Sequence, residues 1–227
     1  MNFFESAMDA VAVWEGGWSD HKSDPGGLTR WGWTLKTLIA KAIDVNGDGR
    51  VNGQDLADMT KAEARALYRV HFWDAIAGDV LPGPLAMLVF NSAINQGPGR
   101  AAKFLQGAVG AKADGAIGPR TLDAVADHWD ADPIAVMREF LTRQMLHYTS
   151  LAIFATFGRG WTRRTMDFAL IAGEALALDT FDASLPAPDV DPAPPAPDPA
   201  PPQRREPSTA WDRIVASLAR GSMKWDR

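Results

Sequence analysis

Apolar residues recur at the helical period along most of the chain up to about residue 180. In the first such segment they are Phe3, Phe4, Met8, Val11, Ala12 and Trp14, and the pair Gly16-Gly17 ends the pattern. The same reasoning predicts helices near residues 2–15, 34–43, 53–57, 61–71, 83–94, 99–108, 119–127, 132–155 and 161–177. Strand-like alternation occurs only near residues 18–34. We therefore expect a mainly α fold of the α+β class with one small β-hairpin.

The predicted hairpin brings together residues with useful chemistry. Asp24-Pro-Gly-Gly is a tight-turn sequence, because proline restricts φ and glycine permits positive φ. In the alternating segment that follows, Thr29, Trp31 and Trp33 would share one face. A hairpin folding back beside the first helix would place Asp24 and Thr29 near Glu15.

Glu15 stands where an apolar helix opens into a glycine-rich loop. Partial desolvation there would raise its pKa and keep some of it protonated near neutral pH, as a proton donor requires. A solvated glutamate beside a helix end explains the spacing equally well. Likewise, tryptophans such as Trp18, Trp31 and Trp33 would serve either as flat faces for sugar rings or as core residues.

A twelve-residue segment from Asp44 to Asp55 matches a calcium-binding loop position by position. Gly49 occupies the turn position, and Asp55 ends the loop where glutamate is usual, as in dockerin repeats. The predicted ligands are Asp44, Asn46, Asp48, the Arg50 carbonyl, Asn52 and Asp55. We expect a structural Ca²⁺ that takes no part in catalysis. The alternative is a surface turn rich in Asp, Asn and Gly that binds no ion.

The amino-acid composition excludes several kinds of active site and binding partner. The chain has no cysteine, which excludes disulfides, cysteine nucleophiles and cysteine-based metal sites. Its four histidines have no metal-ligand spacing, and no glycine-rich phosphate loop follows a strand. With a net charge of −5 and no strong basic run, nucleic acid is not expected as a partner.

The N-terminal residues carry a resemblance to a known family. Glu15-Gly-Gly-Trp, Asp24-Pro-Gly-Gly-Leu-Thr29 and Trp31-Gly-Trp-Thr34 resemble the start of the glycoside hydrolase family 108 lysozymes, which are N-acetylmuramidases of phages and prophages. Phe90 to Pro98 resembles the central helix of that family, and Gly107 to Leu122, with its Asp114-Gly-Ala-Ile-Gly-Pro-Arg-Thr segment, resembles its peptidoglycan-binding half. The likeness covers about residues 3–178. Asn91 departs from the family pattern, which often has aspartate there.

The resemblance implies a lysozyme-like fold whose hairpin carries part of the active site, and an endolysin that degrades the cell wall. Glu15 would be the general acid, and Asp24 and Thr29 would hold water or stabilise developing positive charge, as in the triad of phage T4-type lysozymes. Candidate substrate-binding residues are Trp18, Trp31, Trp33 and Asn95. The partner that the resemblance implies is bacterial peptidoglycan. A lytic transglycosylase acting at the same bond and a non-catalytic, calcium-ordered murein-binding module are the alternatives.

The predicted domain organisation has four parts. Residues 1–94 form the catalytic region with the calcium loop, 95–180 a peptidoglycan-binding-like second lobe, 181–207 a linker rich in Pro, Ala and Asp, and 208–227 a short amphipathic helix. That helix would contact a membrane or another protein. With neither a signal peptide nor a transmembrane segment in the sequence, we expect synthesis in the cytoplasm and action in the periplasm after release, through a holin, a phage particle or other lysis.

Overall fold

The computed structural model describes residues 2–14 and 28–184, with side chains to residue 178. The chain divides into two compact units, one formed by Met1–Glu15 and Arg65–Ser184, the other by Gly16–Ala64 and Leu185–Arg227. We call the described part of the first the helical unit (residues 2–14 and 65–184). The described part of the second is the hairpin–loop unit (residues 28–64).

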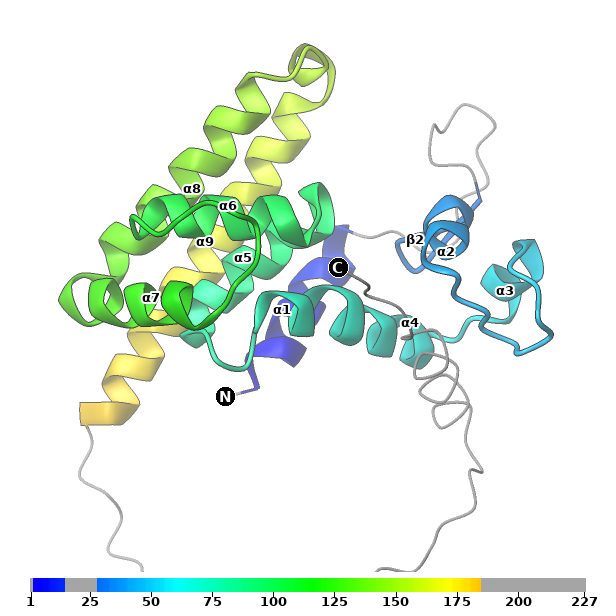
Figure 1. Ribbon diagram of the computed structural model, residues 1–227, viewed down its shortest axis with the longest axis horizontal. Helices are drawn as coiled ribbons and strands as arrows, with labels where there is room; N and C mark the ends of the chain where they lie inside the picture. Colours follow the sequence, from blue (N-terminus) through cyan, green and yellow to red (C-terminus); the bar gives the residue numbers. More distant parts are fainter. Residues whose placement is uncertain (1, 15–27, 185–227) are drawn as a thin grey trace, which may run out of the picture. The chain divides into compact units, whose positions relative to one another are not determined.

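Six α-helices make up most of the helical unit (Figure 1). They are α1 (Phe3–Trp14), α5 (Gly83–Gln96), α6 (Pro98–Ala108), α7 (Pro119–Ala131), α8 (Pro133–Thr149) and α9 (Phe154–Ser184). Helix α5 is central, since it contacts α1, α6, α8 and α9. Helix α8 also packs against α6, α7 and α9, and α8 and α9 run side by side in Figure 1.

The core of this unit is built around α5, whose residues 84–93 are all buried. A helix that is buried on every face lies at the centre of a bundle. Phe90 on α5 meets the rings of Phe4 and Trp73 edge to face, at centroid distances of 6.0 and 5.4 Å. Such aromatic pairs add to the free energy gained from burying their large apolar surfaces. These rings therefore join α1, α5 and the Trp73 segment.

The helix predictions are confirmed in most places, because starts and ends depend on local residues. Proline lies in the first turn of α6, α7 and α8, and the Asp132 side chain accepts a hydrogen bond from the Ala135 N–H at the start of α8. A single helix over 132–155 is wrong. The backbone turns at 150–153, where the Ser150 hydroxyl donates to the His147 carbonyl at 2.7 Å, and α9 begins at Phe154.

The hairpin–loop unit contains the two-stranded antiparallel sheet. Strands β1 (Thr29–Arg30) and β2 (Trp33–Thr34) pair Thr29 with Thr34 and Arg30 with Trp33. Trp31 and Gly32 make the turn, with φ of 52° and 78°, which is the geometry of a tight hairpin turn. The prediction that Thr29, Trp31 and Trp33 share one face of a strand is therefore wrong, because the chain reverses at Trp31.

Short helices complete the hairpin–loop unit. Helix α2 (Leu35–Lys41) precedes the loop of residues 44–55, and α3 (Gly53–Asp58) follows it. Buried Trp33, Leu38, Leu56 and Met59 form its small core. Helix α4 (Lys61–Tyr68) begins in this unit and leads to a π-helical turn, η1 (Arg69–Trp73), and a 3-10 turn, η2 (Asp74–Ile76). Among the described residues, no helix has the length and hydropathy needed to span a bilayer.

Candidate functional site

Three of the predicted site residues, Glu15, Trp18 and Asp24, lie outside the described residues. The described part of α1 reaches Trp14. Thr29, the third member of the predicted catalytic set, is the first residue of β1 and is half-buried. The proximity of Glu15 to Asp24 and Thr29 stays a prediction.

The hairpin tryptophans differ in their surroundings. Trp33 is 1 % exposed, and its indole nitrogen donates to the Ala64 carbonyl at 3.3 Å. Buried in this way, Trp33 has no face left for a sugar ring, so its role is in the core of the hairpin–loop unit. Trp31 is half-buried in the turn, with its indole nitrogen donating to the Met59 carbonyl at 3.3 Å. Trp31 keeps part of its surface accessible.

The predicted calcium loop is wrapped by hydrogen bonds from its own backbone. The two oxygens of Asp44 accept from the N–H groups of Gly47 and Gly49, at 2.7 and 2.8 Å. Both glycines have positive φ, 76° and 84°, which other residues adopt at a cost. Asp48 accepts from the Arg50 N–H at 2.8 Å. The predicted ligand side chains therefore fold back over the loop.

Asp55 closes this loop from inside. It is fully buried, and its two oxygens accept from the N–H groups of Val45 and Asn52, at 2.8 and 2.7 Å. The Asn52 side chain in turn caps α3 by accepting from the Gln54 N–H at 2.8 Å. Among the described residues, no group of three or more His, Cys, Asp or Glu side chains is gathered to hold a metal ion.

Asn95 belongs to a polar cluster at the end of α5. Its amide nitrogen donates to the carbonyl of Asn91 at 2.7 Å and to the Asn91 side-chain oxygen at 3.1 Å. The same Asn91 oxygen accepts from Nε of Arg164 at 2.8 Å. Asn91 is 2 % exposed and Arg164 9 %. Asn91 therefore joins α5 to α9 through a buried guanidinium.

Beside this cluster lies a pocket of about 260 Å³ within the helical unit. It is formed by the end of α5, the first turn of α6, the end of α8 with the turn after it, and α9. Its lining residues are Asn95, Gln96, Arg100, His147, Tyr148, Leu151, Ile153 and Trp161. We call it the Arg100 pocket.

Burial and charge shape the titration of this pocket. Burial, followed by the positive charge of Arg100, lowers the pKa of His147 below its usual value. Burial raises the pKa of Tyr148, against smaller opposing effects of Gln144 and Arg164. At neutral pH His147 is therefore mainly uncharged and Tyr148 keeps its proton. Arg100 is the one permanent cation among the lining residues.

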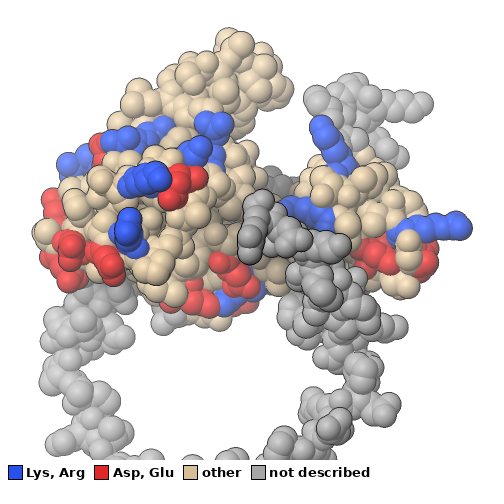
Figure 2. Space-filling model, in the orientation of Figure 1, with Lys and Arg blue, Asp and Glu red and all other residues tan. Residues whose placement is uncertain are grey.

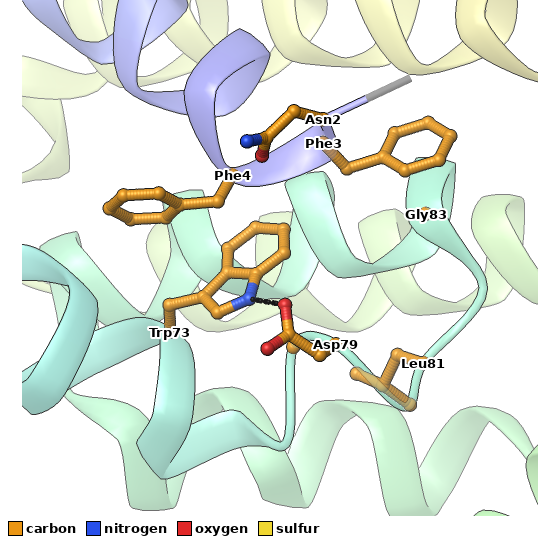
Figure 3. A pocket seen from close by; sticks show the side chains of 8 residues that line it. Asn2, Phe3, Phe4, Trp73, Asp79, Leu81 and Gly83 are labelled. Atoms are coloured by element: carbon orange, nitrogen blue, oxygen red, sulfur yellow. Dashed lines mark hydrogen bonds between the residues drawn. The ribbon is translucent and has the colours of Figure 1, made fainter. Parts of the chain in front are cut away.

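A second pocket, of about 430 Å³, lies where the N-terminal residues meet the segment around Trp73 (Figure 3). Figure 3 shows the ring of Phe4 beside Trp73 and that of Phe3 turned toward Gly83. The indole nitrogen of Trp73 donates to Asp79 at 2.9 Å, and Asp79 also forms an ion pair with Arg69. Asp79, the one acidic residue that lines this pocket, is thus committed to structural contacts. Any side chain at Gly83 would collide with Phe3, at 2.2 Å from the added carbon.

The Asp114-Gly-Ala-Ile-Gly-Pro segment owes its shape to buried Gln106 on α6. The Gln106 amide nitrogen donates to Asp114 at 2.7 Å and to the Ala116 carbonyl at 2.9 Å, while its oxygen accepts from the Gly115 N–H at 2.9 Å. The bond from Gln106 is also the main reason that the pKa of Asp114 lies below its usual value. This motif is therefore a scaffold that leads into α7.

Sequence reasoning missed the burial of Arg164 and the gathering of Arg100 with His147. A signal was present, because Arg164 shares the helical stripe of Trp161, Thr165 and Phe168, which are half-buried or buried. No comparable signal joins Arg100 to His147, which come from different helices.

Comparisons with known proteins agree with the mainly helical fold and match two consecutive parts of the chain. Residues 8–97 match the family described as glycosyl hydrolase 108, and residues 100–166 match a predicted peptidoglycan domain. No curated protein sequence matches the chain. The solved structure of Brucella abortus SagA is similar, with 37 % sequence identity and a TM-score of 0.65. The similarity covers 77 % of this chain and 94 % of SagA.

Proposed function

The chain belongs to the glycosyl hydrolase 108 family, and we propose that it is an N-acetylmuramidase, a lysozyme that cleaves the β-1,4 bond between N-acetylmuramic acid and N-acetylglucosamine. The family match, with the peptidoglycan domain that follows it, identifies a peptidoglycan hydrolase. The observation that carries the finer proposal is the match over residues 8–97, because that range contains Glu15, Asp24 and Thr29.

In the proposed mechanism Glu15 protonates the glycosidic oxygen on C4 of N-acetylglucosamine, and the bond from this oxygen to C1 of muramic acid breaks as positive charge develops on the muramic acid ring. Asp24 stabilises that charge or, with Thr29, holds the attacking water. The distance between the two carboxyl groups would set the stereochemistry, at about 5–5.5 Å for retention and about 6.5–9.5 Å for inversion. We propose that the enzyme acts in the periplasm after release from the cytoplasm by a holin, a phage particle or other lysis.

The decisive experiment compares Glu15→Gln with the unmodified protein in clearing purified murein. We expect the rate to fall by about 10²-fold or more, because the amide cannot donate the proton. Glu5→Gln is the matched control, since Glu5 lies on the same helix and pairs with Arg65 on the surface. It should keep the full rate.

Product analysis separates the alternatives. Mass spectrometry should find reducing muramic acid ends. Anhydro-muramic ends would instead establish a lytic transglycosylase, which has no use for a water held by Asp24 and Thr29. Murein binding by a protein that clears no murein, with or without Glu15→Gln, would establish a non-catalytic module.

We also propose that the loop of residues 44–55 binds a structural Ca²⁺. The sequence match in register, the two positive-φ glycines and the flanking helices α2 and α3 support this proposal. Asp44, Asn46, Asp48, Asn52, Asp55 and the Arg50 carbonyl would hold the ion. Their side chains would move together on binding, because the described structure does not gather the three carboxylates.

Chelation tests the ion. A protein verified to be calcium-loaded should melt at a lower temperature after EDTA treatment, since Ca²⁺ at about 100 times its dissociation constant contributes about 2.7 kcal/mol. Asp48→Asn should abolish this response, whereas Asp130→Asn, on the exposed face of α7, should keep it. Equal melting temperatures with and without Ca²⁺ would exclude the site.

A further inference from the structure

We propose that the Arg100 pocket binds a carboxylate of the murein stem peptide, so that the enzyme grips peptide-bearing glycan more tightly than bare glycan. This inference rests on the proposed function, because it assumes a murein substrate. The pocket joins residues of both family matches, Asn95 and Gln96 from the first and the other lining residues from the second. A substrate that occupies the pocket would touch residues of both matched regions.

The charge of the pocket favours an anion. None of its lining residues is acidic, and among the described residues no carboxylate forms an ion pair with Arg100. Arg100 lies in the first turn of α6, where the helix dipole also favours negative charge. On the face of the molecule in Figure 2, acidic side chains gather over α7, whereas basic ones lie over α6 and α8. A carboxylate could pair with Arg100 through two parallel hydrogen bonds.

The remaining walls fit a short peptide. Leu151 and Ile153 offer apolar surface for the methyl groups of alanine, and Ile153 is 53 % exposed. The Nδ2 of Asn95 is committed to Asn91, which leaves the Asn95 amide oxygen to accept from a peptide N–H. A volume of about 260 Å³ lies just below that of pockets for drug-sized ligands, about 300–1,000 Å³. One or two amino-acid residues would fill it.

The aromatic residues of the pocket argue against a sugar ring as occupant. Trp161 stacks on Tyr148 and on Phe157, with ring centroids 4.8 and 6.0 Å away and interplanar angles of 23° and 24°. These two contacts take up part of its indole surface, whereas sugar recognition needs an open aromatic face. A neutral sugar would also gain little from the guanidinium of Arg100. The stem peptide supplies the charge and the methyl groups that this pocket matches.

Calorimetric titration of the full chain carrying Glu15→Gln would test the proposal without turnover. The two probes are the disaccharide N-acetylglucosaminyl-N-acetylmuramic acid carrying L-Ala-γ-D-Glu-diaminopimelate, and a disaccharide in which the lactyl carboxyl is capped as a methylamide. We expect the peptide-bearing probe to bind at least several-fold more tightly. Arg100→Gln should weaken its binding about tenfold, as loss of a charge-assisted bond predicts, and leave the capped disaccharide unchanged.

Matched variants outside the pocket show whether a loss of affinity is specific to the pocket. Arg120→Gln removes the same charge from the exposed first turn of α7, outside the pocket, and should change neither affinity. Ile153→Asp should weaken the peptide-bearing probe by repulsion, whereas Leu170→Asp, at a site 73 % exposed on α9, should not. Equal affinity for the two probes, or equal losses in Arg100→Gln and Arg120→Gln, would overturn the proposal.

The two proposals fail separately. If Arg100→Gln selectively weakens the peptide-bearing probe while Glu15→Gln still clears murein at the full rate, the pocket is upheld and the role of Glu15 is lost. If Glu15→Gln abolishes clearing while the probes bind equally, the pocket is lost and the muramidase is upheld.

Discussion

In the helical unit α5 is buried along residues 84–93 and is surrounded by other helices, whereas in the hairpin–loop unit residues 46–50 of the loop are all exposed. The helical unit gains its stability mainly from the burial of apolar side chains. The second has a small core around Trp33 and Leu56, and much of its order comes from carboxylates that accept backbone hydrogen bonds. A segment of this size buries too little surface to rely on apolar contacts alone.

The contrast suggests a division of roles. The helical unit forms the walls of the Arg100 pocket, in which we propose that a carboxylate of the murein stem peptide binds. The hairpin–loop unit carries Thr29, and its loop is built from groups whose order would respond to a cation. Three predictions probe this comparison, beginning with the largest effect.

Removing a central ring should damage the helical unit most. Phe90→Ala should lower the free energy of unfolding by about 3–5 kcal/mol, since the ring is fully buried against Phe4, Tyr68 and Trp73. Denaturant unfolding followed by circular dichroism measures this loss. Leu170→Ala, at an exposed position of α9, is the control and should cost less than about 0.5 kcal/mol. Similar losses in both variants would contradict an apolar basis for this unit.

Removing one buried carboxylate should loosen the hairpin–loop unit alone. Asp55→Ala leaves the N–H groups of Val45 and Asn52 without their acceptor, at about 1–3 kcal/mol for each buried group. Hydrogen exchange in EDTA should show faster exchange across residues 44–58 and unchanged protection in α5. Asp58→Ala removes an exposed carboxylate that bonds only side chains and should have a smaller effect. Loss of protection in α5 would show that the two units unfold together.

The smallest effect concerns pH and the helical unit. The pKa of His147 is lower in the folded protein than in the unfolded chain. As the pH falls below about 6.5, the unfolded chain therefore binds more protons at this position than the folded protein does, and the free energy of unfolding decreases. The loss is complete once pH lies below the folded pKa. His147→Gln should remove this contribution to the pH dependence. Between pH 7.5 and 5 the melting temperature of the variant should therefore fall less than that of the unmodified protein, and the two falls should differ by about 2 °C or less. A steeper fall in the variant than in the unmodified protein would reverse the sign and contradict the assignment.

Most helix positions could be predicted, because the hydrophobic period, the prolines at helix starts and the capping residues act within a few positions of one another. The turn at Trp31-Gly32 was missed, since alternation of residue types predicts a strand even where φ turns positive. The break after Thr149 was missed for a similar reason, as an apolar run continues through residues 151–154 without proline or glycine.

The features of the candidate site also divide into those that the sequence predicted and those that only the tertiary structure revealed. The sequence by itself determined the mainly helical class and the family, since these depend on residue types at fixed spacing. It also predicted the calcium-binding loop and the acid Glu15, and both stay predictions. Only the tertiary structure decided that Trp33 and Arg164 are buried, that Asn91 joins α5 to α9, and that Arg100 and His147 share a pocket. Burial and proximity depend on which helices pack together, and residues up to 66 positions apart (Asn95 to Trp161) meet only when the chain has folded.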